Sequence, residues 1–165
     1  MSGQLDAAMS HALCVKAVMG HGRILMLGFG SEILPPPSVI TRPGRRPIFK
    51  HHARPAYELQ TEFARWWIEG PLGILVSRDG EYQPDIVASL LVRKQVMQWK
   101  FLHPGWGLCI NFELDYVLRI LPHDEASKNE VWGIWDSNNY FFEVKPSGEM
   151  FKIHGTEPVK WRGNE

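Results

Sequence analysis

Apolar and polar residues alternate along most of the chain, and this pattern predicts strands more often than helices. The first third contains two apolar runs, residues 15–19 and 23–30, with Gly20-His21-Gly22 as the turn between them. Six further runs follow in the last third, separated by turns rich in Gly, Pro, Asn and Asp: residues 96–102, 107–112, 116–121, 131–135, 140–144 and 150–153. We therefore predict an α+β fold, mostly antiparallel β-meander, with one or two short helices.

Two segments have helical patterns. Residues 5–13 contain alanine and are weakly helical, whereas residues 86–93 place their apolar side chains on one face of a helix. Asp85 comes just before this second segment, and Asp is a residue type that often caps a helix N-terminus. The sequence therefore predicts a helix over 86–93 with Asp85 as its cap.

The middle of the chain is less regular. Residues 57–68 fit both a strand and a helix, and the alternation of the first residues favours a strand. Asp79-Gly80 is a good hairpin turn, so we predict that residues 73–76 pair with residues 81–82. Residues 38–55 are rich in proline and basic residues, which predicts an exposed loop outside the core.

The first and last thirds of the chain can be aligned with each other. The matched positions are Gly22 with Gly105, Leu25 with Leu108, Leu27 with Ile110 and Phe29 with Phe112. Each copy then reaches Ile-Leu-Pro, a polar loop and a Trp-containing segment, so residues 5–82 and 85–153 are candidate half-repeats. The alternative is that any two β-meanders share such alternating apolar residues.

Length and composition indicate one domain spanning residues 1–165. A chain of this length can bury a single large core, and 12% aromatic residues with 7 Trp supply much of it. Eighteen basic and eighteen acidic residues give a formal net charge of zero, which disfavours global attraction to nucleic acid or an anionic membrane. Cys14 and Cys109 form no disulfide framework, and no export signal or membrane-spanning run is evident, so we expect a cytoplasmic protein.

No motif for catalysis, metal or cofactor binding is recognisable. Gly28-Phe29-Gly30 is a fragment of a nucleotide-binding fingerprint, but prolines follow where a helix should open. Cys109 lies between apolar neighbours and is predicted to be a core residue. We expect a non-enzymatic protein without cofactor, although convergence of His51, His52 or Cys109 in one pocket would make an unrecognised enzyme.

Two features indicate binding. The first is a basic, proline-rich segment that can bind phosphates or an acidic protein surface, with residues Arg42, Arg45, Arg46, Lys50, His51, His52 and Arg54. The second is the abundance of tryptophan, since exposed Trp beside Arg is typical of interface hot spots. We expect Trp106 and Trp161 to be partly exposed, and a solvated loop is the alternative interpretation of the basic segment.

The spacing of apolar and Trp residues resembles that of small bacterial domains similar to immunity-type proteins, which neutralise partner toxins. The resemblance is carried by Leu25-x-Leu27-x-Phe29-Gly30, Tyr57-x-Leu59-Gln60 leading to Trp66, Leu108-x-Ile110-x-Phe112, and Leu118-x-Ile120-x-Pro122 with Glu130-x-Trp132. Trp67 departs from it, standing where a basic residue is expected. It implies a non-catalytic protein that binds another protein, a cognate toxin; nucleic-acid binding through the basic segment is the alternative.

Overall fold

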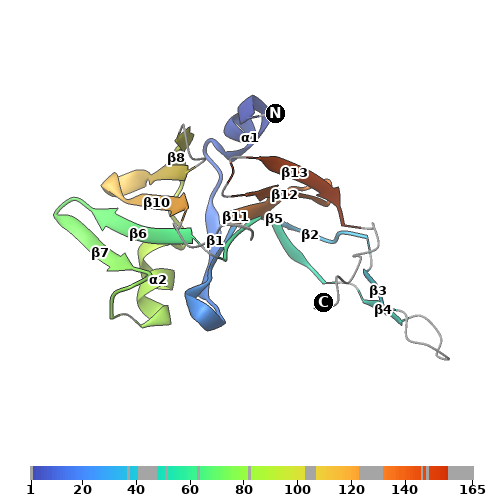
Figure 1. The fold of residues 1–165 in the computed structure, drawn as a ribbon, viewed down its shortest axis with the longest axis horizontal. Coiled ribbons are helices and arrows are strands. Elements are labelled where there is room, and N and C mark those ends of the chain that lie inside the picture. The colour runs from blue at the N-terminus through green and yellow to red at the C-terminus, as the bar shows by residue number, and fades with distance from the viewer. Residues whose placement is uncertain are drawn as a thin grey trace.

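The computed structural model describes residues 2–36, 38–40, 48–50, 52–62, 64–81, 83–102, 107–122, 132–145, 147 and 149–155. In these residues the fold is mostly antiparallel β-sheet with two short α-helices, which confirms the predicted class (Figure 1). Two sheets of six and five strands pack with their inner faces together. A separate two-stranded ribbon lies away from both sheets.

The six-stranded sheet combines strands from both ends of the chain. Its order is β1 (Cys14–Met19), β2 (Leu25–Ile33), β5 (Arg54–Thr61), β11 (Trp132–Trp135), β12 (Tyr140–Val144) and β13 (Met150–His154). A short 3-10 turn, η1 (His21–Arg23), connects β1 and β2 and places Gly22 at φ 69°. The predicted first hairpin is therefore confirmed.

The five-stranded sheet is equally mixed. Its order is β7 (Gly73–Ser77), β6 (Ala64–Gly70), β10 (Val117–Pro122), β9 (Gly107–Phe112) and β8 (Val96–Leu102). The 3-10 turn η2 (Glu113–Asp115) joins β9 to β10. The remaining elements are α1 (Ser2–Met9), which packs on β8, α2 (Pro84–Leu91), which packs on β1, and the ribbon of β3 (Ser38–Ile40) and β4 (Ile48–Lys50).

The chain passes from one sheet to the other within a segment that the sequence predicted to be one strand. Residues 57–68 are not one strand: β5 ends at Thr61 in one sheet and β6 begins at Ala64 in the other. The predicted meander of the last third is likewise divided, because β10 pairs with β6 and β11 pairs with β5. The predicted neighbours β8–β9, β9–β10, β11–β12 and β12–β13 do pair, and the prediction is wrong only between β10 and β11, which lie in different sheets.

Four local predictions differ from the structure. The hairpin partner of β7 is β6, joined through Pro71-Leu72, so Glu81 is not in a strand; Tyr82 lies outside the described residues. Gln83 rather than Asp85 occupies the N-cap of α2, because Pro84 fixes the first helical position. The first helix ends at Met9, well before Leu13. The segment 38–55 contains β3, β4 and the start of β5 as well as loop.

An aromatic cluster fills the space between the inner faces of the two sheets. Trp99 of β8 contacts Phe29 of β2 edge to face, with ring centroids 6.3 Å apart, and lies 6.5 Å from Trp132 of β11. Phe101 stacks on Trp132 at 5.8 Å. Edge-to-face and stacked pairs add to the burial of apolar area, so this cluster is a main source of cohesion between the sheets.

If the β3–β4 ribbon and β13 are set aside, the described helices and strands of the two halves follow the same order. In each half a helix precedes three strands of one sheet, and two strands of the other sheet follow. These elements are α1, β1, β2, β5, β6 and β7 in the first half, and α2, β8, β9, β10, β11 and β12 in the second. Trp66 of β6 pairs with Ile120 of β10, and Trp132 of β11 pairs with Thr61 of β5. Trp66 and Trp132 thus hold corresponding places, each on the first strand after the change of sheet.

Reciprocal backbone hydrogen bonds join the two halves. The amide of Cys14 donates to Lys94 O and that of Val96 donates to Ala12 O, both at 2.9 Å. His11 and Arg93, which precede β1 and β8, both adopt left-handed φ values, 66° and 69°. The segments before β1 and β8 therefore pair with each other and connect an edge of one sheet to an edge of the other.

The alternation along β6 generates a stability prediction. The Trp66 side chain is 1% exposed and points inward, whereas Trp67 is half-buried on the outer face. We expect Trp66→Ala to lower the free energy of unfolding by about 3–5 kcal/mol, and Trp67→Ala by less than half as much. Urea denaturation would measure both. Equal losses would contradict the assignment of Trp66 to the core.

Candidate functional site

The structure accounts for only part of the predicted binding segment. Arg42, Arg45, Arg46, His51, Trp106 and Trp161 lie outside the described residues, and Lys50 is described only as the last residue of β4. His52 and Arg54 lie together at the margin of the six-stranded sheet, where they line one hollow. Arg54 is the first residue of β5 rather than a solvated loop side chain.

The outer face of the six-stranded sheet carries a row of side chains that crosses every strand. The register places one residue from each of β1, β2, β5, β11, β12 and β13 side by side. We call this set the cross-strand row: Lys16, Gly28, Glu58, Trp135, Phe141 and Ile153. Because side chains on one face of a sheet contact their cross-strand neighbours, the row forms a continuous surface.

An ion pair occupies one end of the row. Lys16 Nζ lies 2.9 Å from Glu58 Oε1, across the intervening strand β2. Gly28 makes this approach possible, since a Cβ there would clash with the Pro55 ring and lie 3.0 Å from Lys16 Cβ. The pair is partly exposed and therefore contributes little to stability. Its main effect is to fix one positive and one negative group at the surface.

Arg54 lies against the middle of the row. Its guanidinium carbon is 5.6 Å from the centre of the Trp135 ring, within cation–π range. Nη2 donates to Asp136 O at 2.7 Å, and Nη1 donates to Pro55 O at 3.1 Å. Burial lowers the pKa of Arg54 from its ordinary value, and the attraction of Glu58 and Asp136 offsets this in part. Arg54 is thus a partly desolvated cation held by neutral carbonyl groups.

The other end of the row is apolar, with Trp135 half-buried, Phe141 buried and Ile153 exposed. The rings of Trp135 and Phe141 lie 5.0 Å apart. Ile153 is 39% exposed, and Phe151, two residues earlier on β13, is 44% exposed. Lys145 lies 5.9 Å from the centre of the Phe151 ring and is ion-paired with Glu143. Aromatic, aliphatic and basic groups therefore adjoin one another on this face.

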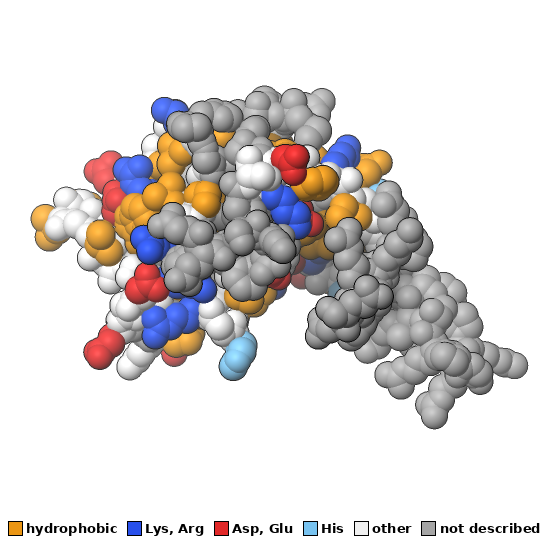
Figure 2. Space-filling view, viewed as in Figure 1, with side chains coloured by type: hydrophobic (Ala, Val, Ile, Leu, Met, Phe, Trp, Pro, Cys, Tyr) orange, Lys and Arg blue, Asp and Glu red, His pale blue; other side chains and the backbone are white. Residues whose placement is uncertain are grey.

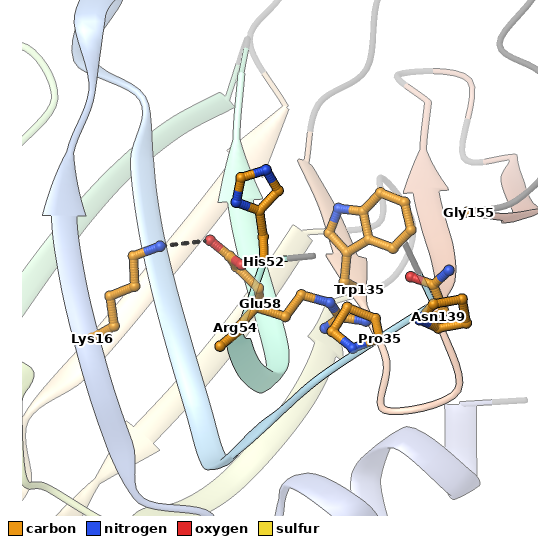
Figure 3. A pocket seen from close by; sticks show the side chains of 10 residues that line it. Lys16, Pro35, His52, Arg54, Glu58, Trp135, Asn139 and Gly155 are labelled. Carbon is orange, nitrogen blue, oxygen red and sulfur yellow. Dashed lines mark hydrogen bonds and ion pairs between the residues drawn. The ribbon is translucent and has the colours of Figure 1, made fainter. Parts of the chain in front are cut away.

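Two hollows open beside Arg54. The first has a volume of about 370 Å³ and is lined by Lys16, Pro35, Pro36, His52, Ala53, Arg54, Glu58, Trp135, Asn139 and Gly155 (Figure 3). The second, of about 530 Å³, shares Lys16, Ala53 and Arg54 with it and continues toward Gly30 and Glu32. Both are large enough for a side chain or a small ligand. Lys16 and Arg54 border both hollows, which makes these cations accessible from two sides.

Sequence reasoning missed most of this site. Lys16, Glu58 and Trp135 are far apart in the chain and become neighbours only through the pairing of β1, β2, β5 and β11. The sequence did contain one indication of their position. Each of the three lies at a position in an alternating run whose side chain is expected to point away from the core. On the face seen in Figure 2, described acidic and basic side chains are interspersed.

The outer face of the five-stranded sheet has different chemistry. Glu69 accepts hydrogen bonds from Trp67 Nε1 at 2.7 Å and Arg119 Nε at 2.9 Å, and these bonds lower its pKa. Cys109 lies beside Arg119 and Asn111, with its sulfur 3.9 Å from Arg119 Nη1 and 3.5 Å from Asn111 Oδ1. Its pKa is raised mainly by burial. This setting does not activate the thiol as a nucleophile.

Other classes of site find no support in the described part of the chain. Its His, Cys, Asp and Glu side chains form no group of three or more that could hold a metal ion. Neither α1 nor α2, each of eight residues, has the length and apolar character of a membrane-spanning helix.

Comparisons with known proteins give no match. No family model matches this chain, and neither a curated protein nor a solved structure is significantly similar to it.

The two thiols generate a reactivity prediction. Burial raises the pKa of Cys14 to about 12, and a raised pKa leaves little reactive thiolate at pH 8. We expect iodoacetamide to modify Cys14 only when the protein unfolds, and to modify Cys109 slowly in the native state. Mass spectrometry of peptides from the native protein, with Cys109→Ser to isolate Cys14, would measure this. Modification of Cys14 at the rate of a free thiol would contradict it.

Proposed function

We propose that this chain is a non-catalytic binding protein and that the cross-strand row, with Arg54, forms its contact surface for another protein. One observation carries the proposal: Arg54 lies over the half-buried Trp135 ring, and the buried Phe141 separates that ring from exposed Ile153 and Phe151 on the neighbouring strand. Arg and Trp are the residue types that most often dominate binding energy, and they do so when neighbouring groups exclude water. The rim of charged groups at Lys16 and Glu58 would orient the partner.

The narrower proposal is an immunity-type inhibitor that binds and neutralises a partner toxin. It is supported by the resemblance in apolar and Trp spacing described above. Such a protein needs a rigid surface rather than a catalytic group, and the row lies on paired strands of a six-stranded sheet. A cytoplasmic location is part of the same proposal.

A nucleic-acid-binding role is the second candidate. It is favoured by the separate two-stranded ribbon of β3 and β4 (Figure 1). The sequence between these strands contains Arg42, Arg45 and Arg46. A two-stranded ribbon has the dimensions to enter the major groove of DNA, and basic residues supply phosphate contacts.

Partner capture tests the proposal. We expect tagged protein to recover a stoichiometric protein partner from lysate of its native host, identified by mass spectrometry. Trp135→Ala should weaken the binding of that partner by at least about tenfold, because a hot-spot truncation costs about 2 kcal/mol or more. Trp67→Ala, on the outer face of the other sheet, is the matched control and should bind normally.

Two results would contradict the proposed surface. Equal binding by the Trp135 and Trp67 variants would place the contact elsewhere on the molecule. Recovery of nucleic acid in place of protein, with affinity that falls steeply as salt rises, would instead favour the basic ribbon.

We further propose that the two halves of the chain derive from one duplicated unit. The support is the repeated order of elements, the corresponding places of Trp66 and Trp132, and the reciprocal hydrogen bonds of Cys14 and Val96. In this proposal each half lends a strand pair to the sheet of the other half.

This relationship leads to a matched stability test. Trp66 and Trp132 are both fully buried, at 1% and 0% exposure. We expect Trp132→Ala to lower the free energy of unfolding by an amount within about 1 kcal/mol of the loss caused by Trp66→Ala, about 3–5 kcal/mol. Urea denaturation of the two variants would compare them. A loss at Trp132 less than half that at Trp66 would contradict structural equivalence.

A further inference from the structure

We propose that the 370 Å³ hollow beside Arg54 binds a carboxylate carried on a flat apolar group. This inference rests on the proposed function, because it names the chemistry recognised at the same surface. The carboxylate would bind to the Arg54 guanidinium, and the flat group would lie against Trp135 and the prolines that line the same hollow. Figure 3 shows these side chains around one opening.

The state of Arg54 argues for an anionic ligand. The guanidinium is partly desolvated, and its described hydrogen-bond acceptors are the uncharged carbonyls of Pro55, Ala56 and Asp136. Glu58 and Asp136 attract this half-buried cation through their charge, and a carboxylate bound directly to it would add two oxygens that match the planar guanidinium. Lys16 borders the same hollow and adds a second positive charge. An entering carboxylate would therefore meet Arg54 together with the Lys16–Glu58 ion pair.

The walls of the hollow argue for a flat apolar carrier. Pro35, Pro36 and Trp135 line it, and these side chains present flat or rigid apolar surfaces. Arg54 already stacks on the Trp135 ring, so a ligand aromatic group would extend a layer that exists in the free protein. Little side-chain ordering would be needed on binding, which favours affinity.

Glu58 opposes the proposed ligand and so provides a sharp test. Its carboxylate lines the same hollow and is paired with Lys16 at 2.9 Å. Replacing it with a neutral amide would remove a repulsive charge and release Lys16 toward the ligand. If the Glu58 carboxylate holds the site in shape, its loss would weaken binding of the carboxylate ligand. If it only repels that ligand, its loss would strengthen binding. The direction of the Glu58→Gln effect therefore separates these two roles.

The experiment is an NMR titration of the full chain, labelled with ¹⁵N, with phenylacetate and its neutral isostere phenylacetamide. We expect saturable shifts with phenylacetate, including the indole N–H of Trp135 assigned with Trp135→Phe, and at least about tenfold weaker binding of phenylacetamide. Arg54→Gln should weaken phenylacetate binding by about tenfold or more, the loss of a charge-assisted hydrogen bond. Glu58→Gln should strengthen it several-fold. Lys100→Gln, which removes an exposed cation from β8, is the matched control and should leave it unchanged.

Two further probes distinguish the source of the carboxylate. N-acetyl-phenylalanine presents a C-terminal carboxylate, and N-acetyl-aspartyl-phenylalanine amide presents a side-chain carboxylate. Tighter binding of either than of phenylacetate indicates a protein ligand, and tighter binding of phenylacetate indicates a free aromatic acid.

The inference is overturned if phenylacetamide binds as well as phenylacetate, or if Glu58→Gln weakens binding. Should Arg54→Gln fail to fold, the Glu58→Gln and phenylacetamide results decide the matter. Partner capture is measured separately, so a partner that binds through Trp135 without any preference for phenylacetate would refute this inference alone.

Discussion

The exchange of strands between the two sheets is the constraint on which the rest of the structure depends. β5 and β6 are separated by only Glu62 and Phe63, yet they belong to different sheets. Each sheet therefore needs strands from both halves of the chain, with β5 beside β11 and β6 beside β10. Because these pairings place Trp66 and Trp132 in the interior, the same constraint builds the aromatic core between the sheets.

The candidate site is a product of this exchange. Glu58 comes from the first half of the chain and Trp135 from the second, and they are cross-strand neighbours only because β11 joins the sheet of β5. Arg54 then connects the same two strands, through its hydrogen bond to Asp136 O and its contact with the Trp135 ring. The proposed contact surface is thus held by the same strand pairing that completes the six-stranded sheet.

The sequence predicted local structure better than it predicted the site. The two-residue repeat of apolar positions predicted β8, β9 and β12 with the boundaries that the structure shows. Such a repeat can be read from the residues of the strand alone. The change of sheet at residues 62 and 63 has no such local signature, since alternation continues on both sides of it. The site depended on that change, so only Arg54 and His52 of its lining residues were identified in advance. Gly28 shows the same limit: its role is evident only once Pro55 and Lys16 flank it.

The paired segments before β1 and β8 have a mechanical consequence. The bridge of Leu13 with Gln95 and the hydrogen bonds around it close the two sheets along one side, whereas β13 and β7 end their sheets on the other. The two-residue link between β5 and β6 joins the sheets at a second place. Separating the sheets would therefore require both the loss of the hydrogen bonds at residues 11–14 and 93–96 and the displacement of strands that are covalently linked.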